Sequence, residues 1–200
     1  MITREGTIGY LKGLGDVFLK IEVTNAQGKS NSLEHGFEEA IKIVSEQANK
    51  RKKIIFIGNG GSAAIASHQS VDYWKNGGMR AIAFNDTSLL TCIGNDYGYP
   101  FVFEKPIEMF ADPGDVLIAI SSSGKSENIT NGAKMAKKKG LTVITMSGFK
   151  PDNPLRSLGG LNFYVPALTG AYGFVEIAHL TICHCIVDAI IDRNLITPVK

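Results

Sequence analysis

Hydrophobic residues occur along most of this chain in short continuous runs, and longer amphipathic segments separate the runs. A short run without polar alternation is typical of a strand that is covered on both faces of a sheet. Such runs predict five strands, at residues 53–57, 80–84, 115–120, 141–146 and 161–165. The segments that alternate with them predict helices at residues 62–75, 100–110, 126–139 and 172–193. This alternation indicates an α/β fold with a five-stranded, doubly wound parallel sheet.

Two amphipathic helices are expected before this core, separated by a short polar break. The first covers residues 8–23 and the second residues 32–48, and both repeat apolar residues at helical spacing. We therefore expect residues 1–50 to form a helical arm, residues 51–193 the main domain and residues 194–200 a frayed tail. The arm either packs on a neighbouring subunit or covers the sheet of its own chain, and the pattern favours neither alternative.

The composition is that of a globular protein of one domain, because the 200 residues are 44% hydrophobic and 20% charged. The formal net charge is only +2. The one dense basic run, at residues 137–139, lies at the end of a predicted helix, where it complements the helix dipole. Nothing in the charge pattern indicates the clustered basic face of a nucleic-acid-binding protein.

Three cysteines, Cys92, Cys183 and Cys185, form no disulfide framework, which favours a reducing compartment. The N-terminal residues lack the continuous apolar region of a signal peptide. No run approaches the roughly 20 apolar residues of a membrane span. We therefore expect a soluble cytoplasmic protein.

A glycine-rich turn follows the first strand of the predicted core. It consists of Gly58, Asn59, Gly60 and Gly61, and Ser62 stands where the next helix begins. Such a turn places backbone N–H groups at a helix N-terminus, which favours a bound anion. The sequence therefore predicts a phosphate site here.

The helix after this turn carries His68 and Asp72 at positions i and i+4, on one face. The two side chains can converge on one ion, because zinc accepts histidine and carboxylate ligands. Without a metal they form a satisfied polar pair. A phosphate site followed by this pair suggests chemistry on a phosphorylated small molecule.

A second loop repeats this arrangement after the strand predicted at residues 115–120. Four serines, Ser121, Ser122, Ser123 and Ser126, surround a glycine, and a helix is expected to open near the last of them. Their density favours a second anion site, although serine also caps helices and fills loops.

Two nucleotide-binding motifs are matched only in part. The serine loop resembles the end of a P-loop, but Ala119 stands where that motif needs glycine, which argues against a nucleoside triphosphatase. Gly58, Gly60 and Ala63 fit the dinucleotide motif, but the acidic residue, Asp86, lies further along than the motif expects. A nicotinamide enzyme stays an alternative, although the serine loop has no role in it.

Polar residues also follow the second strand and occupy the last helix. Asn95 and Asp96 are candidates for contacts to sugar hydroxyls, or they form turns and caps. The last predicted helix is apolar nearly all round but carries Glu176, His179 and His184. Burying such groups without partners costs free energy, which favours a functional role for them.

These motifs together resemble the phosphoheptose isomerases, a branch of the SIS (sugar isomerase) domains. The matching segments are GNGGSAA with the histidine that follows it, GNDYG, PGDVLIAISSSGKSENI and the C-terminal helix with its histidine. The resemblance covers about residues 30–193. It implies a flavodoxin-like, three-layer αβα sandwich and a homotetramer whose sites lie at subunit interfaces and often hold zinc.

The resemblance also assigns roles to residues of this sequence. Substrate contacts fall on Asn59, Gly60, Gly61, Ser62, Asp72, Asn95, Asp96, Ser121, Ser122, Ser123, Ser126 and Glu176. The implied metal ligands are His68, Asp72, Glu176 and His184. Asp72 stands where the family has glutamate, and Glu176 where it has glutamine. About 12 Å of helix rise separates Glu176 from His184, so the two could share an ion only by leaning toward each other.

The implied function is an aldose–ketose isomerase that converts sedoheptulose 7-phosphate to D-glycero-D-manno-heptose 7-phosphate, a heptose precursor for lipopolysaccharide or capsule. The reaction moves a proton between C1 and C2 through an enediol and needs a base and an acid. We expect Asp72 or Glu176 as the base and His184 as the acid. The alternative is a non-catalytic SIS protein that binds sugar phosphates or associates with the bacterial replication initiator. An adaptor needs no such buried polar trio, which favours the enzyme.

Overall fold

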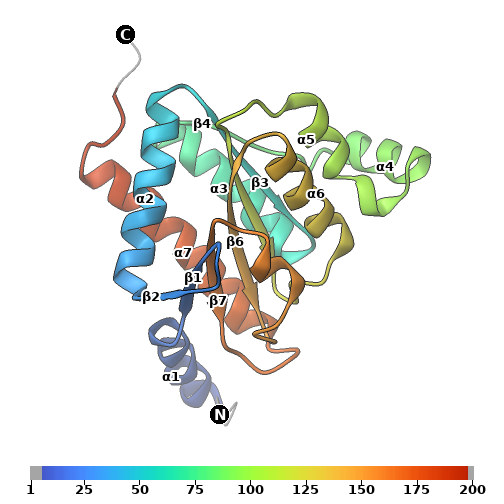
Figure 1. Cartoon of the computed structure of the whole chain (residues 1–200). Coiled ribbons are helices and arrows are strands. Elements are labelled where there is room, and N and C mark those ends of the chain that lie inside the picture. The colour runs from blue at the N-terminus through green and yellow to red at the C-terminus, as the bar shows by residue number, and fades with distance from the viewer. Residues whose placement is uncertain (1–5, 198–200) are drawn as a thin grey trace.

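One seven-stranded sheet forms the centre of this computed structural model, which describes residues 6–197 (Figure 1). The strand order is β2-β1-β7-β6-β5-β3-β4. Five parallel strands correspond to the predicted ones, namely β3 (Lys53–Gly58), β4 (Arg80–Ala83), β5 (Val116–Ser121), β6 (Thr142–Gly148) and β7 (Leu161–Val165). Numbered among themselves they run 2-1-3-4-5, an order of doubly wound sheets whose ligands bind at the carboxyl ends of the strands.

An antiparallel hairpin extends the sheet beyond β7. Strand β1 (Glu22–Asn25) pairs with β7, and β2 (Ser30–Asn31) pairs with β1. The prediction of a five-stranded sheet is therefore wrong by these two strands. The hairpin turn is held by the side chain of Asn25, which accepts hydrogen bonds from two backbone N–H groups, and it passes through Gly28 at a φ of 75°.

The expected first helix ends early, as α1 (Gly6–Leu19), because Val23 is buried in the sheet opposite Phe163. Residues 1–50 are thus not an all-helical arm, since they also contain the hairpin. The second expected helix is confirmed as α2 (Leu33–Asn49), whose N-cap Ser32 accepts a hydrogen bond from the N–H of His35. Residues 1–5 of the proposed arm lie outside the described part of the chain.

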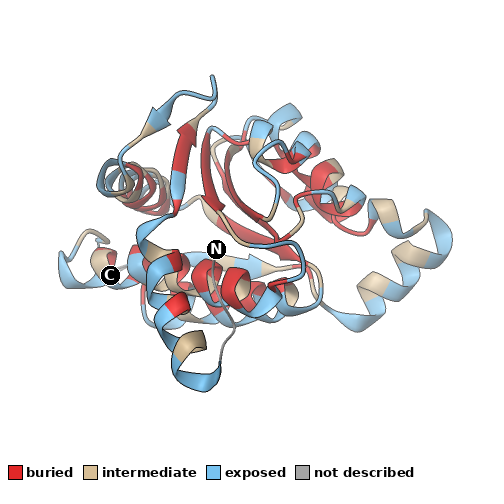
Figure 2. Ribbon diagram, turned by 90° about the horizontal axis from the view of Figure 1, so that it is seen from below, coloured by how far each residue is buried: buried red, intermediate tan, exposed pale blue. Residues whose placement is uncertain are grey.

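Helices cover both faces of the sheet, so the buried strands lie between two helical layers (Figure 2). One layer contains α1, α2, α3 (Gly61–Lys75) and α7 (Tyr172–Asp192). The other contains α5 (Glu104–Phe110) and α6 (Glu127–Lys138), with the short 3-10 helices η1 (Tyr99–Phe101) and η2 (Pro154–Ser157). Alternate residues of β3 serve the two cores: Ile54 and Phe56 face the first, and Ile55 and Ile57 the second.

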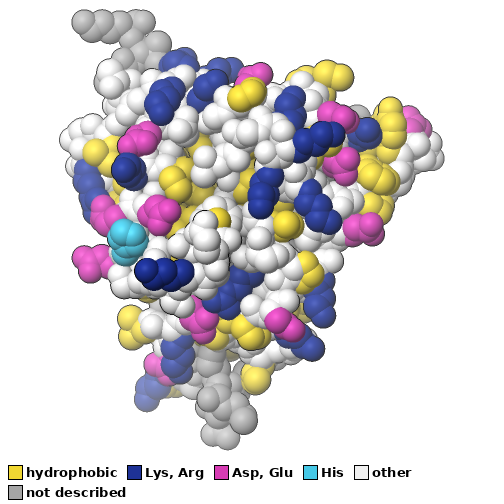
Figure 3. Space-filling model, viewed as in Figure 1, with side chains coloured by type: hydrophobic (Ala, Val, Ile, Leu, Met, Phe, Trp, Pro, Cys, Tyr) yellow, Lys and Arg dark blue, Asp and Glu magenta, His cyan; other side chains and the backbone are white. Residues whose placement is uncertain are grey.

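A helix that the sequence pattern did not predict, α4 (Thr87–Asp96), begins at the N-cap Asp86, which accepts a hydrogen bond from the N–H of Leu89. None of its residues is buried, and Figure 1 shows it projecting beside α5. The helix expected at residues 100–110 is present only from Glu104, since η1 takes its first turn. On the face seen in Figure 3, Lys and Arg side chains are interspersed with Asp and Glu.

Helix α7 is long and apolar enough to cross a membrane by length and composition alone, which corrects the expectation that no segment is. Half of it is buried inside the fold, where it packs on α2 and α3, as a core helix does. The chain after α7 is not frayed as far as Thr197, because Asn49 binds it twice, through the carbonyl of Leu195 and the N–H of Thr197. Residues 198–200 lie outside the described part.

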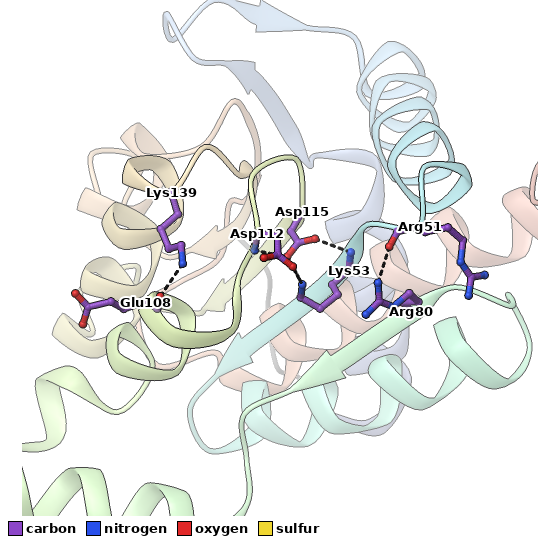
Figure 4. Close-up of polar contacts among 7 residues, drawn as sticks. All are labelled: Arg51, Lys53, Arg80, Glu108, Asp112, Asp115 and Lys139. Atoms are coloured by element: carbon purple, nitrogen blue, oxygen red, sulfur yellow. Dashed lines mark hydrogen bonds and ion pairs between the residues drawn. The ribbon is translucent and has the colours of Figure 1, made fainter.

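The amino ends of the parallel strands are joined by an ion-pair network (Figure 4). Lys53 contacts both Asp112 and the buried Asp115, with 2.8 Å from its Nζ to Oδ2 of Asp115. Asp115 also accepts hydrogen bonds from the backbone N–H groups of Lys53 and Asp112. Burial alone lowers the pKa of Lys53, but the hydrogen bonds and charges of the two carboxylates raise it overall. The network lies at the amino ends of the strands, and the candidate site lies at the opposite, carboxyl ends.

Candidate functional site

The glycine turn between β3 and α3 is built so that only small residues fit. A side chain at Gly58 would place its Cβ 2.4 Å from the backbone oxygen of Ser62, and Gly60 has a φ of 55°. No side chain caps the N-terminus of α3. The N–H groups of Ser62 and Ala63 already donate to the backbone carbonyls of Asn59 and Gly60, so the turn offers an anion the N–H of Gly61 and the positive end of the helix dipole.

The serine loop between β5 and α6 forms a second open helix N-terminus. Ser121 Oγ accepts a hydrogen bond from the N–H of Gly124 and lies 3.4 Å from Ser126 Oγ. Ser126 is the N-cap residue of α6, but its hydroxyl does not cap the helix. The hydroxyl of Ser122 is buried and has no partner. Unpaired hydroxyl and N–H groups in one loop suit a phosphate, whose oxygens accept several hydrogen bonds.

The two turns open into one cleft of about 140 Å³. Its lining residues are Asn59, Ser62, Ser121, Ser122, Ser123, Ser126, Tyr172 and Glu176. The carboxyl group of Glu176 lies against Gly61, since an added Cβ there would come within 2.4 Å of three of its atoms. The structure therefore brings Glu176, from the last helix, to the N-terminus of α3, where the helix dipole favours a negative charge.

A second cleft, of about 280 Å³, is also lined by Asn59. The side-chain amides of Asn59 and Asn128 exchange two hydrogen bonds of 2.9 Å, and the hydroxyl of Tyr99 donates to Asn59 Oδ1 at 3.1 Å. Asn85 also lines this cleft and holds the backbone of α3 through Ala63, while its own Oδ1 is buried without a partner. Asn59 is thereby fixed between the two clefts.

A histidine–carboxylate group lies further along α3 and α7. His68 Nε2 is 3.3 Å, and His184 Nδ1 3.8 Å, from the same oxygen of Asp72. One ligand atom from each of the three residues lies within 4.8 Å of the others. Two imidazole nitrogens and a carboxylate oxygen are a donor set that zinc accepts, with a fourth position open. The His–Asp pair predicted from the sequence is confirmed as a contact, and His184 joins it.

Glu176 does not belong to this group. Helix α7 passes α3 in the same direction, with Glu176 beside Gly61 and His184 beside Gln69. The eight residues between Glu176 and His184 correspond to about 12 Å of helix rise. Within one chain, three of the four expected metal ligands therefore come together. The fourth, Glu176, lines the 140 Å³ cleft beside the serine loop, which we call the serine cleft.

Asn95 and Asp96 lie apart from both clefts. They stand at the exposed end of α4 and bond to each other, with 2.9 Å from Asn95 Nδ2 to Asp96 Oδ1. His179, the other histidine of α7, is fully buried, and its Nε2 lies 3.2 Å from the carbonyl oxygen of Ser147. Burial lowers its pKa to about 4, so it is a neutral core residue near pH 7.

Three polar residues of this region were not identified from the sequence: Asn128, Tyr99 and Gln69. Gln69 is fully buried, and its Nε2 lies 3.0 Å from His184 Nε2. A signal for it exists, because Gln69 stands four residues from both Ile65 and Tyr73 and so places an amide on the apolar stripe of α3. No local pattern marks Asn128 or Tyr99, whose partner is more than 35 residues away in the sequence.

Comparison with known proteins identifies the family. The family model of the SIS domain matches residues 22–148. A phosphoheptose isomerase of Cytophaga hutchinsonii is 35% identical over 173 residues, which are 84% of this chain and 87% of that protein. This chain belongs to the SIS-domain family of phosphoheptose isomerases. A phosphoheptose isomerase of Aliarcobacter butzleri is 39% identical over 68% of this chain and 75% of its own length.

A solved structure supports the same assignment. The phosphoheptose isomerase of Neisseria gonorrhoeae superposes with a TM-score of 0.72 and 32% identity over 80% of this chain and 87% of that one. The resemblance inferred from the glycine turn, the serine loop and the C-terminal helix is thus confirmed, and so is the α/β fold with a mostly parallel sheet.

Proposed function

We propose that this protein is an aldose–ketose isomerase that converts sedoheptulose 7-phosphate to D-glycero-D-manno-heptose 7-phosphate, a heptose precursor for lipopolysaccharide or capsule. The observation that carries the proposal is the serine cleft, in which two uncapped helix N-termini and a carboxylate meet. Relatives named phosphoheptose isomerase at 35–39% identity support the substrate. They favour the enzyme over the non-catalytic alternative.

The serine loop binds the phosphate of the substrate in this proposal. The hydroxyls of Ser121, Ser122, Ser123 and Ser126 and the N-terminus of α6 supply hydrogen-bond donors. Holding the remote phosphate fixes the reacting carbons against the protein, which removes part of the entropic barrier. Asn59, Gly60, Gly61 and Ser62 bind the sugar from the α3 side of the cleft. Asn95 and Asp96, at the exposed end of α4, are further proposed contacts to sugar hydroxyls, although a single chain does not bring them to this cleft.

Glu176 is our first candidate for the base. Its carboxylate is in the same cleft as the serine loop, whereas Asp72 lies more than two turns further along α3. The base removes a proton from C1 and returns it to C2, while an acid protonates O2 and the hydroxyl at C1 gives up its proton as the aldehyde forms. Asp72 is the alternative base, and His184 is the proposed acid. Both belong to the histidine–carboxylate group, where they contact each other.

His68, Asp72 and His184 would hold a metal ion, for which zinc is our proposal, with Glu176 as a further ligand only where subunits meet. A bound zinc ion supplies charge that stabilises a developing oxyanion. The protein residues retain the tasks of binding phosphate, orienting the sugar and moving the proton.

We further propose a cytoplasmic homotetramer with a flavodoxin-like core, in which His184 reaches the site of a neighbouring subunit. The distance along α7 between Glu176 and His184 supports this, because one chain does not bring both to the same cleft. Exposed apolar residues on α1, Ile8, Leu11 and Leu19, and on α5, Met109 and Phe110, support large subunit contacts.

Three measurements test these proposals. A coupled assay with sedoheptulose 7-phosphate should show turnover, and light scattering should show a tetramer at micromolar concentration. Absence of turnover with zinc present would contradict the isomerase, and a monomer would remove the shared site. If the phosphate site is correct, sedoheptulose 7-phosphate should also raise the melting temperature of the parent and raise it less in Ser126→Ala.

A further inference from the structure

Gln69 is an amide in an otherwise apolar position. It is fully buried on the face of α3 that carries Ile65 and Tyr73, whereas its neighbour His68 is exposed. Burying an amide costs free energy unless its polar atoms are hydrogen-bonded. An apolar side chain would fill this position without that cost, so the amide needs an explanation.

The amide contacts one ring nitrogen of His184 and leaves its other end unpaired. Gln69 Nε2 lies 3.0 Å from His184 Nε2, while Gln69 Oε1 is buried and has no partner. The second ring nitrogen, Nδ1, faces Asp72 at 3.8 Å. The imidazole of His184 thus lies between the amide of Gln69 on one side and the carboxylate of Asp72 on the other.

This contact links the ring nitrogen that carries the proton to the orientation of the Gln69 amide. A neutral imidazole has one donor and one acceptor, and an amide offers either its NH₂ or its oxygen after a half turn. With the NH₂ of Gln69 toward the ring, Nε2 of His184 accepts and Nδ1–H points to Asp72. With the oxygen toward the ring, Nε2–H donates and the Nδ1 lone pair points to Asp72 instead.

We propose that Gln69 is a positioning residue that sets the tautomer of His184 by turning its amide, so that Nδ1 becomes a metal ligand only when Gln69 Oε1 faces the ring. The proposal rests on the metal site of the proposed function, formed by His68, Asp72 and His184. It adds Gln69, which contacts the other ring nitrogen of His184 and so decides whether the Nδ1 lone pair can bind the metal. Gln69 Oε1, which is buried without a partner, is the atom that would accept the Nε2–H of His184 when Nδ1 binds a metal.

Three variants separate this role from packing. Gln69→Met keeps the volume and removes both hydrogen-bonding atoms. Gln69→Glu keeps an acceptor and, when ionised, has no NH₂, so it favours the Nε2–H tautomer. Tyr73→Phe is the matched control, because it removes a buried hydrogen bond between the same two helices, from the Tyr73 hydroxyl to the carbonyl of Cys183, without touching His184. Circular dichroism confirms the fold of each variant.

The readouts are zinc affinity, by competition with a chromophoric chelator, and the ¹⁵N spectrum of the His184 ring, assigned from its loss in His184→Asn. We expect the metal-free parent to show the Nδ1–H tautomer and to change to Nε2–H on addition of zinc. Gln69→Met should lose the preference and bind zinc 10- to 100-fold more weakly, the scale known for partners of metal ligands. Gln69→Glu and Tyr73→Phe should bind within about threefold of the parent.

Several results would overturn the proposal. Gln69→Met that binds zinc like the parent and keeps its tautomer would show that Gln69 only fills space. Tyr73→Phe that weakens zinc as much as Gln69→Met would assign the effect to helix packing. If the parent binds no zinc, both the metal site and the proposed role of Gln69 are wrong. The isomerase proposal is tested separately, by turnover of sedoheptulose 7-phosphate.

Discussion

Replacing Gly61 by alanine should disable the enzyme without unfolding it, because Glu176 occupies the space of the new methyl group. An added Cβ would lie 2.4 Å from the carboxyl atoms of Glu176, about 1 Å short of ordinary van der Waals contact. The far end of a flexible side chain gives way more easily than backbone, so the carboxylate moves. A misplacement of about 1 Å can cost about 100-fold in rate.

The stability of the variant should change in the opposite direction. Alanine is favoured over glycine in a helix by up to about 1 kcal/mol, and Gly61 is the first residue of α3 with no positive φ. We therefore expect a melting temperature equal to or above that of the parent, and kcat lower by about 10²-fold. Gly15→Ala is the matched control, since a Cβ there meets nothing within 4 Å, and it should leave kcat unchanged.

The double variant Gly61→Ala/Glu176→Gln shows whether the loss acts through Glu176. Two changes that act on one group are not additive, so the double variant should be no slower than Glu176→Gln alone. If Gly61→Ala turns over substrate like the parent, turnover does not depend on the position of the Glu176 carboxylate. A double variant far slower than Glu176→Gln would instead show that the methyl group blocks the substrate directly.

Three further predictions concern the same residues and the core. Glu176→Gln should lower kcat by at least about 10²-fold, the scale of general-base loss, and Asp72→Glu should retain more activity than Asp72→Asn; full turnover in Glu176→Gln with none in Asp72→Asn would make Asp72 the only base. Ser123→Ala and Ser126→Ala should each weaken substrate binding by about 1 kcal/mol or somewhat more, measured by calorimetry, and parental affinity in both would place the phosphate elsewhere. The free energy of unfolding should fall by up to about 3 kcal/mol as the pH drops from about 6.5 toward 4, because burial lowers the pKa of His179 to about 4 while the unfolded chain takes up the proton near 6.5. His179→Gln should abolish that part of the acid dependence in urea titrations, and an unchanged dependence would exclude His179 as its source.

The parts of the fold that could be predicted are those with a strong local pattern. The apolar runs of β3, β5, β6 and β7 are buried on both faces, so their sequence alone marks them, whereas the edge strand β4 alternates exposed and half-buried residues. Strand β1 has only four residues, and its buried Val23 continues the apolar stripe of α1, which made the segment look helical. Helix α4 buries no residue, so no hydrophobic period marks it.

The candidate site divides in the same way. The glycine turn and the serine loop could be predicted because the residues that form each of them are consecutive in the sequence. The positions of Glu176 and His184 on different clefts depend on how α7 passes α3, which no spacing within α7 reveals. Gln69 carried a signal, a polar residue on an apolar stripe, but its partner is 115 residues away in the sequence.

The most direct test of the central claim is incubation of the purified protein with sedoheptulose 7-phosphate and zinc, with the products followed by NMR. We predict conversion to D-glycero-D-manno-heptose 7-phosphate, with solvent deuterium appearing at C2 when the reaction runs in ²H₂O, because the base exchanges its proton during enediol formation. Substrate that binds and raises the melting temperature but stays unconverted, without deuterium at C1 or C2, would contradict the assignment of this chain as an isomerase.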